Sequence, residues 1–155
     1  MKKIYLSGKA GEGRYTTVDD DIFTEMGQRK WYLLKRIYVA SKINGKWVYL
    51  HRYIMKPSNG QQVDHVNRDP LDNCRRNLRI CTSWQNALNR NIQKNNTSGY
   101  TGVIWDKYNK AWRAQIKVHG KFRAVGYFSD IIDAVKAYND AAAESFGEYA
   151  RLNQI

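Results

Sequence analysis

The 155-residue sequence contains few cysteines, fewer acids than basic residues and no long apolar run. Its two cysteines, Cys74 and Cys81, are too few for a disulfide framework and form no C-x-x-C pair, so we expect free thiols in a reducing compartment. No apolar run approaches a membrane span, and no secretory hydrophobic region follows Met1-Lys2-Lys3. These absences predict a cytoplasmic protein without a membrane partner.

Positive charge dominates the composition. Lysine and arginine number 26 against 14 acidic residues, which gives a net charge of +12 and an isoelectric point near 9.8. The charge is spread along the chain rather than gathered in a tail, so it predicts several basic surfaces. Such surfaces are typical of proteins that bind DNA or RNA. The length allows one domain or two small ones.

An acid and a histidine stand side by side at Asp64 and His65, on a short predicted strand. Asn77 follows 12 residues after the histidine, and Asn86 follows 21 residues after it. A histidine can take a proton from water near neutral pH. Oxygens of Asp64 and Asn86 suit a magnesium ion, which keeps much of its hydration shell. Hydrolysis of a phosphodiester needs both an activated water and a group that absorbs charge on the phosphate.

Local patterns refine the positions of these side chains. Adjacent strand residues point to opposite faces, so a site shared by Asp64 and His65 requires a twist, a bulge or a metal at the strand edge. Downstream, Thr82 and Gln85 form a capping box that predicts a helix over 83–91. Asn86 falls on the side of that helix opposite its apolar face, where it meets either a ligand or solvent.

The order and spacing of Asp64-His65, Asn77 and Asn86 resemble the HNH nuclease motif in its His-Asn-Asn form. The resemblance implies a two-stranded hairpin closed by a helix around one divalent metal ion, Mg²⁺ or alternatively Mn²⁺. It implies that His65 is the general base, that Asp64 and Asn86 are the metal ligands, and that Asn77 organises the loop around the histidine. Some HNH nucleases also hold a structural zinc on four cysteines, which this chain lacks, so we expect no structural zinc.

Other residues near the motif compete for roles. Asn73 is an alternative to Asn77 as the middle asparagine, although the spacing favours Asn77. His51 precedes the motif and either packs or contacts a phosphate. Three arginines crowd the predicted hairpin, and beside a phosphate-cutting site we expect them to contact DNA: Arg75, Arg76 and Arg79.

The first 50 residues predict a β-rich platform that braces the hairpin and adds phosphate contacts. Strands are expected at 3–6, 31–40 and 46–50, a hairpin turn at 43–46 and a short helix that starts within 18–23. This segment resembles the leader that precedes the motif in many phage HNH endonucleases.

A second pattern begins after a polar stretch at 89–98. Strands are predicted at 99–105, 111–118 and 121–128, with a tight turn at His119-Gly120. Ser129 is expected to cap a helix over 130–146, which Gly147 ends. The predicted apolar face of the helix consists of Ile131, Ala134, Val135, Tyr138 and Ala142.

Strict alternation along 111–118 assigns the two faces of this sheet. The apolar positions Trp112, Ala114, Ile116 and Val118 are predicted to pack on the helix. The polar positions Arg113, Gln115, Lys117 and His119 then face outward. A row of long donors and acceptors suits the major groove of DNA, although an ordinary solvated sheet face has the same pattern.

Segment 99–153 resembles the Apetala-two, or ethylene-response-factor, DNA-binding domain. The match lies in Tyr100-x-Gly102-Val103, Trp112-Arg113-Ala114-Gln115-Ile116, Gly126-Tyr127-Phe128, Ala134-x-x-Ala137-Tyr138-x-x-Ala141-Ala142 and Leu152-Asn153. The base-reading positions of that family fall on Gln115 and Lys117. Thr101 and Ile104 stand where plant members carry arginines, so the plant target sequence does not transfer. The DNA contacts expected in this segment are Arg113, Gln115, Lys117, Lys121 and Arg123.

Together these patterns predict an α+β fold with an HNH endonuclease domain at 1–92, a linker at 93–98 and a DNA-binding domain at 99–155. The first domain divides into the platform, 1–50, and the HNH core, 51–92. The function expected is that of an HNH homing endonuclease, acting as a monomer on double-stranded DNA in a bacterial or phage-infected cell. The alternatives are a DNA-binding regulator with a degenerate nuclease motif and, less favoured, an RNA-binding protein. RNA binding needs exposed aromatic side chains on the sheet, whereas Trp112 is expected to point inward.

Overall fold

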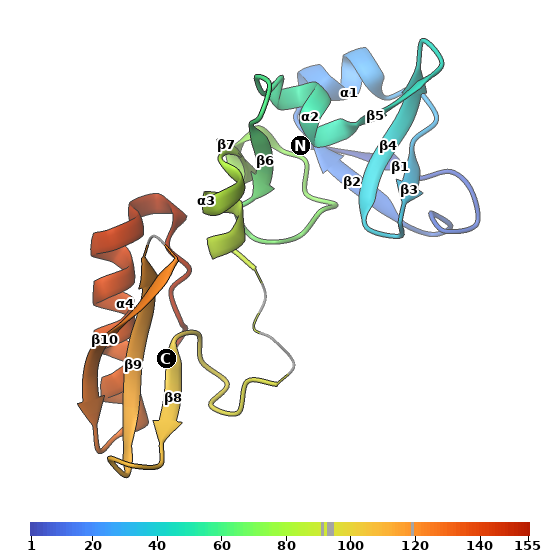
Figure 1. Cartoon of the computed structure of the whole chain (residues 1–155). Helices are drawn as coiled ribbons and strands as arrows, with labels where there is room; N and C mark the ends of the chain where they lie inside the picture. The colour runs from blue at the N-terminus through green and yellow to red at the C-terminus, as the bar shows by residue number, and fades with distance from the viewer. Residues whose placement is uncertain (91, 93–94, 119) are drawn as a thin grey trace. The chain divides into compact units, whose positions relative to one another are not determined.

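A computed structural model describes the chain except for residues 91, 93–94 and 119. It divides into two compact units, Met1–Ala87 and Leu88–Ile155 (Figure 1). The division falls five residues before the predicted boundary at residue 92. Helices and antiparallel sheets are mixed, which confirms the α+β class. None of the helices in the described ranges is long and apolar enough to cross a membrane.

The platform of the first unit consists of two small antiparallel sheets and two helices. Its elements are β1 (Lys2–Tyr5), β2 (Tyr15–Val18), α1 (Asp20–Met26), β3 (Tyr32–Leu34), β4 (Tyr38–Ile43), β5 (Lys46–Tyr49) and α2 (Leu50–Met55). The single strand predicted over 31–40 is wrong, because Lys35 and Arg36 adopt positive φ and turn the chain back between β3 and β4. Neither β2 nor α2 was predicted, since four and six residues are too few for a repeated hydrophobic pattern to stand out.

The platform core extends into the HNH hairpin. Trp31 and Leu50 are fully buried at its centre, and the same cluster includes Val63 and Leu78 from the hairpin. Burial of these large apolar side chains, at about 25 cal/mol per Å² removed from water, makes platform and hairpin one folding unit.

The hairpin and the helix occur in the order that the motif implies. They consist of β6 (Gln62–His65), the short 3-10 turn η1 (Arg75–Asn77), β7 (Leu78–Cys81) and α3 (Ser83–Leu88). The predicted capping box is confirmed, because the backbone N–H of Thr82 donates to Gln85 Oε1 over 2.8 Å and the N–H of Gln85 donates to Thr82 Oγ1 over 3.2 Å. The helix ends at Leu88 rather than 91, with Asn89 in a turn and residue 91 outside the described residues.

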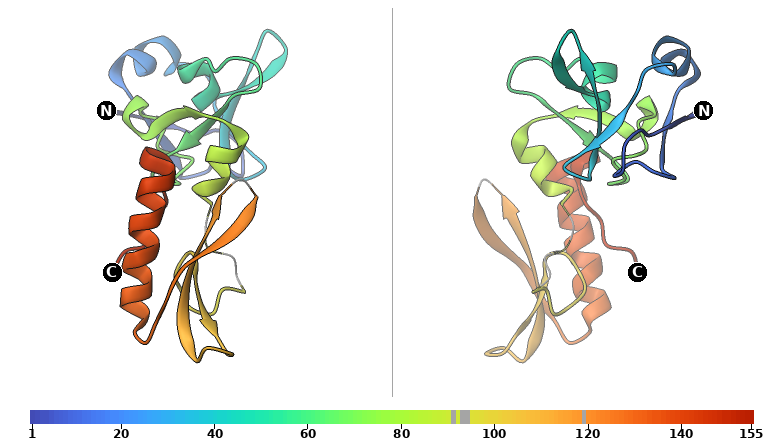
Figure 2. Two further views of the ribbon diagram at one scale, coloured as in Figure 1. Left: turned by 60° about the vertical axis from the view of Figure 1, so that its left-hand side comes forward. Right: turned by 90° about the vertical axis from the view of Figure 1, so that its right-hand side faces the viewer.

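The second unit is a three-stranded antiparallel sheet with one long helix along one face (Figure 2). Its elements are β8 (Val103–Asp106), β9 (Ala111–Val118), β10 (Lys121–Phe128), α4 (Ile131–Phe146) and the 3-10 turn η2 (Gly147–Tyr149), and the strand order is β10-β9-β8. The limits of β9 and β10 were predicted correctly. The first strand starts later than predicted, because Gly99 and Gly102 take positive φ in turns.

Two details of this unit correct or confirm the local predictions. The helix cap is Asp130 rather than Ser129, since Asp130 Oδ1 accepts the backbone N–H groups of Ile132 and Asp133. The predicted helix face does pack on the sheet: its members at 134, 135, 138 and 142 are buried, and Ile131 packs at the edge of the cluster. The predicted turn at His119-Gly120 includes residue 119, which lies outside the described residues.

Candidate active site

The loop between β6 and β7 is held by a strand from the platform. The backbone N–H of Thr17 donates to the Leu71 carbonyl over 2.9 Å, and the N–H of Asn73 donates to the Thr17 carbonyl over 2.9 Å. The hydroxyl of Thr16 donates to the same Leu71 carbonyl over 2.7 Å. Because β2 lies some 55 residues earlier in the chain, this loop takes its shape from tertiary contacts rather than from its own sequence.

His65 is the last residue of β6 and is only 6% exposed. Its Nε2 lies 3.3 Å from Oδ1 of Asn73, a residue with no exposed surface. The amide nitrogen of Asn73 donates to Thr16 Oγ1 over 2.8 Å and to the Pro70 carbonyl over 3.1 Å. A carbonyl can only accept, so Pro70 fixes the amide with its oxygen toward the histidine. His65 Nε2 therefore carries the proton, and Nδ1 is the basic nitrogen of the neutral ring.

A second histidine packs against the first. The rings of His51 and His65 meet edge to face with centroids 5.3 Å apart, and Tyr49 stacks on His51 with centroids 5.7 Å apart. Burial lowers the pKa of His51 to about 3, helped by the nearby charges of His65 and Arg52. His51 thus takes the packing role, one of its two predicted alternatives.

Burial also lowers the pKa of His65 below its ordinary value of 6.5, although the bond to Asn73 and the charge of Asp64 act in the opposite direction. The imidazole is therefore neutral at pH 7, which is the form that a general base requires.

Asn77 organises the loop rather than the histidine itself. Its Oδ1 accepts the backbone N–H of Asn67 over 2.9 Å, and its Nδ2 donates to the Asp72 carbonyl over 2.8 Å. These bonds tie the two ends of the loop together beside His65. Sequence spacing singled out Asn77 and left Asn73 as an alternative, whereas the structure gives each a separate contact. The spacing favoured Asn77, and no sequence signal indicated that Asn73 would contact the histidine.

Asp64 faces Arg79, its cross-strand partner on β7. Its Oδ2 accepts from Arg79 Nε over 3.0 Å and from Nη2 over 2.7 Å, and both side chains are nearly buried. The pairing of β6 with β7 runs without a register shift, so no bulge turns Asp64 toward the face of His65. Two of the three predicted routes therefore remain, a twist of the strand and approach from the strand edge, where β6 ends at His65.

Asn86 lies on the same side of the hairpin as Asp64. Its Nδ2 donates to Gln62 Oε1 over 2.6 Å, and Gln62 stands two residues from Asp64 on β6, so the two share a face. Among the described residues no group of three or more His, Cys, Asp or Glu side chains gathers as a metal site. A cation here would rest on one carboxylate and one amide oxygen, completed by water and phosphate, which is a donor set that suits Mg²⁺.

Sequence comparison places these residues in a family. The chain is 30% identical over 151 residues to an uncharacterized HNH endonuclease of Acanthamoeba polyphaga mimivirus, and the alignment covers 94% of this chain and 78% of that protein. The chain belongs to the HNH endonuclease family. It is also 32% identical over 96 residues to protein 3.8 of Escherichia phage T7, covering 60% of this chain and 76% of that protein. No family model and no solved structure matches the chain.

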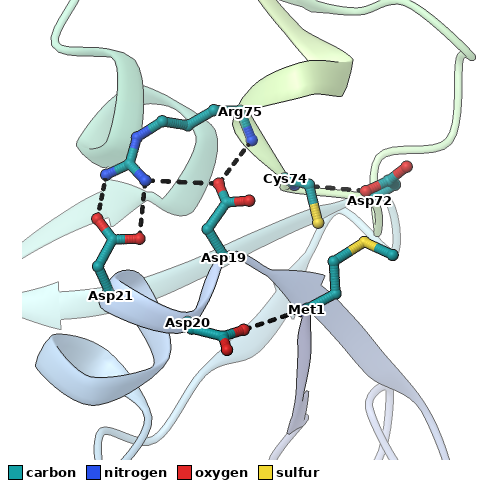
Figure 3. A network of polar contacts seen from close by, with 7 residues as sticks. All are labelled: Met1, Asp19, Asp20, Asp21, Asp72, Cys74 and Arg75. Atoms are coloured by element: carbon teal, nitrogen blue, oxygen red, sulfur yellow. Dashed lines mark hydrogen bonds and ion pairs between the residues drawn. The ribbon is translucent and has the colours of Figure 1, made fainter.

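The three arginines beside the HNH motif differ in their surroundings. The Arg75 guanidinium donates to both carboxylate oxygens of Asp21, over 2.8 and 2.6 Å, and its backbone N–H donates to Asp19 over 2.8 Å (Figure 3). Arg79 forms an ion pair with Asp64, whereas Arg76 is exposed to solvent. Their contact with DNA stays a prediction, and Arg76 has the position best suited to it.

The sheet of the second unit does not present all its predicted DNA contacts on one face. Arg113 Nη2 donates to Gln115 Oε1 over 2.8 Å, and Lys117 lies beside them on the face away from α4. Register pairs Arg123 with the buried Ile116 and Lys121 with Val118, so these two cations belong to the helix-covered face. The predicted outward position of His119 lies outside the described residues.

Exposed aromatic side chains lie beside Arg113 and Lys117 on the sheet face away from α4. Phe122 pairs with Lys117 and is 68% exposed, while Tyr127 pairs with Arg113 and is 48% exposed. The Lys117 ammonium lies 5.2 Å from the centroid of the Phe122 ring. Trp112 packs against the core as predicted. Its inward position does not argue against stacking on nucleic acid, because Phe122 and Tyr127 supply the exposed rings.

Proposed function

We propose that this HNH family member is a metal-dependent endonuclease of the homing type, which hydrolyses phosphodiester bonds in double-stranded DNA. The observation that supports it best is the buried pair of Asn73 and His65. The Pro70 carbonyl fixes the amide, the amide fixes the imidazole tautomer, and Nδ1 is left as the base. This bond holds His65 in a tautomer that a general base can use.

Each residue of the motif then has a role. His65 takes a proton from the attacking water, a contribution of about 10² to 10⁴ in rate. Asp64 and Asn86 would hold Mg²⁺, and Asn77 keeps the loop closed. The bound ion would supply positive charge that stabilises the phosphate and the leaving oxygen. Arg79 shares the Asp64 carboxylate, which has enough lone pairs to accept a guanidinium and also ligate a cation.

The second unit is proposed to set the position of the enzyme on DNA, as its resemblance to the Apetala-two domain implies. Arg113, Gln115 and Lys117 form the outer row that would contact the duplex, with Gln115 and Lys117 at the reading positions. The net charge of +12 supplies the attraction that holds such a protein on DNA at low salt.

A supercoiled-plasmid assay tests this proposal. The wild-type chain with Mg²⁺ should give nicked or linear plasmid, and excess EDTA should stop the reaction. The His65→Ala variant should lose cleavage and keep its affinity for duplex DNA, because a base contributes little to binding. Cutting that persists in EDTA, or a variant that cuts at the wild-type rate, would contradict the proposal.

One observation favours a second candidate, a DNA-binding regulator with an inactive motif. Asp64, the only acid among the proposed ligands, is already paired with Arg79 in nearly buried surroundings. A guanidinium in that position competes with a metal ion for the same carboxylate. Tight, sequence-specific binding without cleavage under Mg²⁺, Mn²⁺ or any other divalent ion would favour the regulator.

A further inference from the structure

We propose that the platform holds a DNA backbone phosphate in a basic pocket formed by Lys9, Arg14 and Arg36, far along the chain from the HNH motif. We call it the platform pocket. The inference rests on the proposed function for its ligand, duplex DNA, and it adds an anchoring site that neither the HNH motif nor the second unit contains.

The composition of the pocket indicates an anion. Its volume is about 380 Å³, and its lining consists of Lys9, Ala10, Arg14 and Arg36, three cations with no carboxylate. The ion pairs found among the described residues involve none of these three side chains. Like charges that share a concave surface repel one another, and a phosphodiester relieves the repulsion while releasing counterions from the DNA.

The fold holds the two parts of this pocket together. Lys9 and Arg14 lie in the loop between β1 and β2, and Arg36 lies in the turn between β3 and β4. The backbone N–H of Ser7 donates to the Trp31 carbonyl over 2.7 Å, and Ser7 forms an isolated bridge with Tyr32. The pocket is therefore preorganised, which reduces the entropy lost when an anion is bound.

The backbone that presents Arg36 is itself unusual. Lys35 and Arg36 have φ of 52° and 58°, and the turn closes through the Ile37 N–H and the Leu34 carbonyl at 3.1 Å. Hairpin turns with two left-handed residues strongly favour Asn-Gly, because other side chains are disfavoured there. A lysine and an arginine instead occupy both positions. Strained backbone of this kind clusters at ligand-binding sites, and here its effect is to place a cation at the rim of the pocket.

The platform pocket shares Arg14 with a second hollow that the HNH loop also lines. Arg14 also lines a neighbouring hollow of about 480 Å³, whose other walls include Asp69, Asp72 and Arg76. Asp69, Asp72 and Arg76 all belong to the connection between β6 and β7, with Arg76 in η1. A DNA backbone anchored at Arg36 would thus meet Arg14 and then Arg76 as it approaches the loop, all within one compact unit.

Adjacent residues of the turn give a matched pair of variants. Arg36→Asn and Lys35→Asn each remove one positive charge, and asparagine tolerates positive φ at both positions. Only Arg36 lines the pocket. The affinity of the full chain for a short duplex is measured in EDTA, to prevent cutting, between about 50 and 200 mM salt. Thermal unfolding of each variant is measured in parallel.

The slope of log affinity against log salt concentration (the salt slope) should be lower by about 0.9 for Arg36→Asn, because one phosphate contact is lost. Over this salt range, wild type should then lose about threefold more affinity than the variant. Lys35→Asn should keep nearly the wild-type slope, and Lys9→Ala should resemble Arg36→Asn. Arg36→Asn should unfold at the wild-type temperature or above it. Equal slopes for the two turn variants would overturn the pocket, since the effect would then be one of net charge alone.

The platform pocket and the proposed endonuclease activity can fail independently of each other. If wild type cuts plasmid and the slope of Arg36→Asn is unchanged, the pocket is refuted and the nuclease stands. If wild type does not cut but Arg36→Asn loses a phosphate contact, the pocket stands and the nuclease is refuted. Absence of duplex binding by wild type even at low salt would overturn the pocket.

Discussion

Replacing Asn73 with alanine should slow DNA cleavage far more than it weakens DNA binding. The substitution removes the acceptor that fixes the His65 tautomer and two further hydrogen bonds, to Thr16 and to the Pro70 carbonyl. Asn73 has no exposed surface, so it cannot contact DNA directly. Without its Oδ1, the His65 ring is free to place its proton on Nδ1, and that tautomer cannot act as the base.

Two magnitudes follow from the contacts. Three hydrogen bonds at about 1 kcal/mol each give a loss of about 3 kcal/mol in the free energy of unfolding. This is a fraction of the 5–15 kcal/mol typical of domains, so the variant should remain folded at 25 °C. The cleavage rate should fall by up to about 10² to 10⁴, the full contribution of general acid–base catalysis.

The assay must separate stability from chemistry. Urea unfolding gives the folded fraction, and single-turnover plasmid cleavage with enzyme in excess gives the rate of that fraction. The ¹⁵N chemical shifts of the His65 imidazole report which nitrogen carries the proton. Thr16→Val is the matched control: it loses two hydrogen bonds, to Leu71 and Asn73, but keeps the contact between Asn73 and His65.

The control should therefore lose about 2 kcal/mol of stability and still cleave near the wild-type rate. The role assigned to Asn73 is refuted if the Asn73→Ala variant keeps the proton on Nε2 and its folded fraction cleaves at the wild-type rate. It is also refuted if Thr16→Val loses cleavage as severely as Asn73→Ala, because stability alone would then account for both.

Three further predictions concern other parts of the chain. Asp64→Ala should reduce Mg²⁺ or Mn²⁺ affinity and cleavage together, as measured by titration calorimetry and the plasmid assay; a metal affinity that does not change would remove Asp64 from the site. The pKa of His51 is about 3 in the fold against 6.5 when unfolded, so its contribution to stability is complete above pH 6.5 and is lost as the pH falls, by about 1.4 kcal/mol per unit. Between pH 7.5 and 5, the free energy of unfolding of His51→Phe should therefore fall by about 2 kcal/mol less than that of wild type, as measured in urea titrations. An equal fall in both proteins would show that His51 does not titrate differently in the folded and unfolded states. In the full chain, Gln115→Ala should relax sequence preference and Lys117→Ala should lower the salt slope by about 0.9, both measured by competition binding on duplex DNA.

Local chemistry was sufficient to predict much of this protein from its sequence. The spacing of Asp64-His65, Asn77 and Asn86 indicated the family, which the viral relative confirms. The capping box before α3 and the alternation along β9 also held, because caps and strand periods depend on residues that are close in sequence. The net positive charge also predicted a nucleic-acid partner, because a sum over the composition needs no knowledge of the fold.

Only the tertiary structure decided which groups meet at the site. The side chain of Asn73, which contacts His65, also donates a hydrogen bond to Thr16, 57 residues earlier in the chain. The pairing of Arg75 with Asp21 spans 54 residues, and Arg79 meets Asp64 only because the hairpin register places them opposite. No period or motif encodes such pairs, since they arise when burial of a common core closes long loops and brings polar side chains together. The sequence therefore singled out the candidate site residues, and the packing of the platform on the hairpin selected their partners.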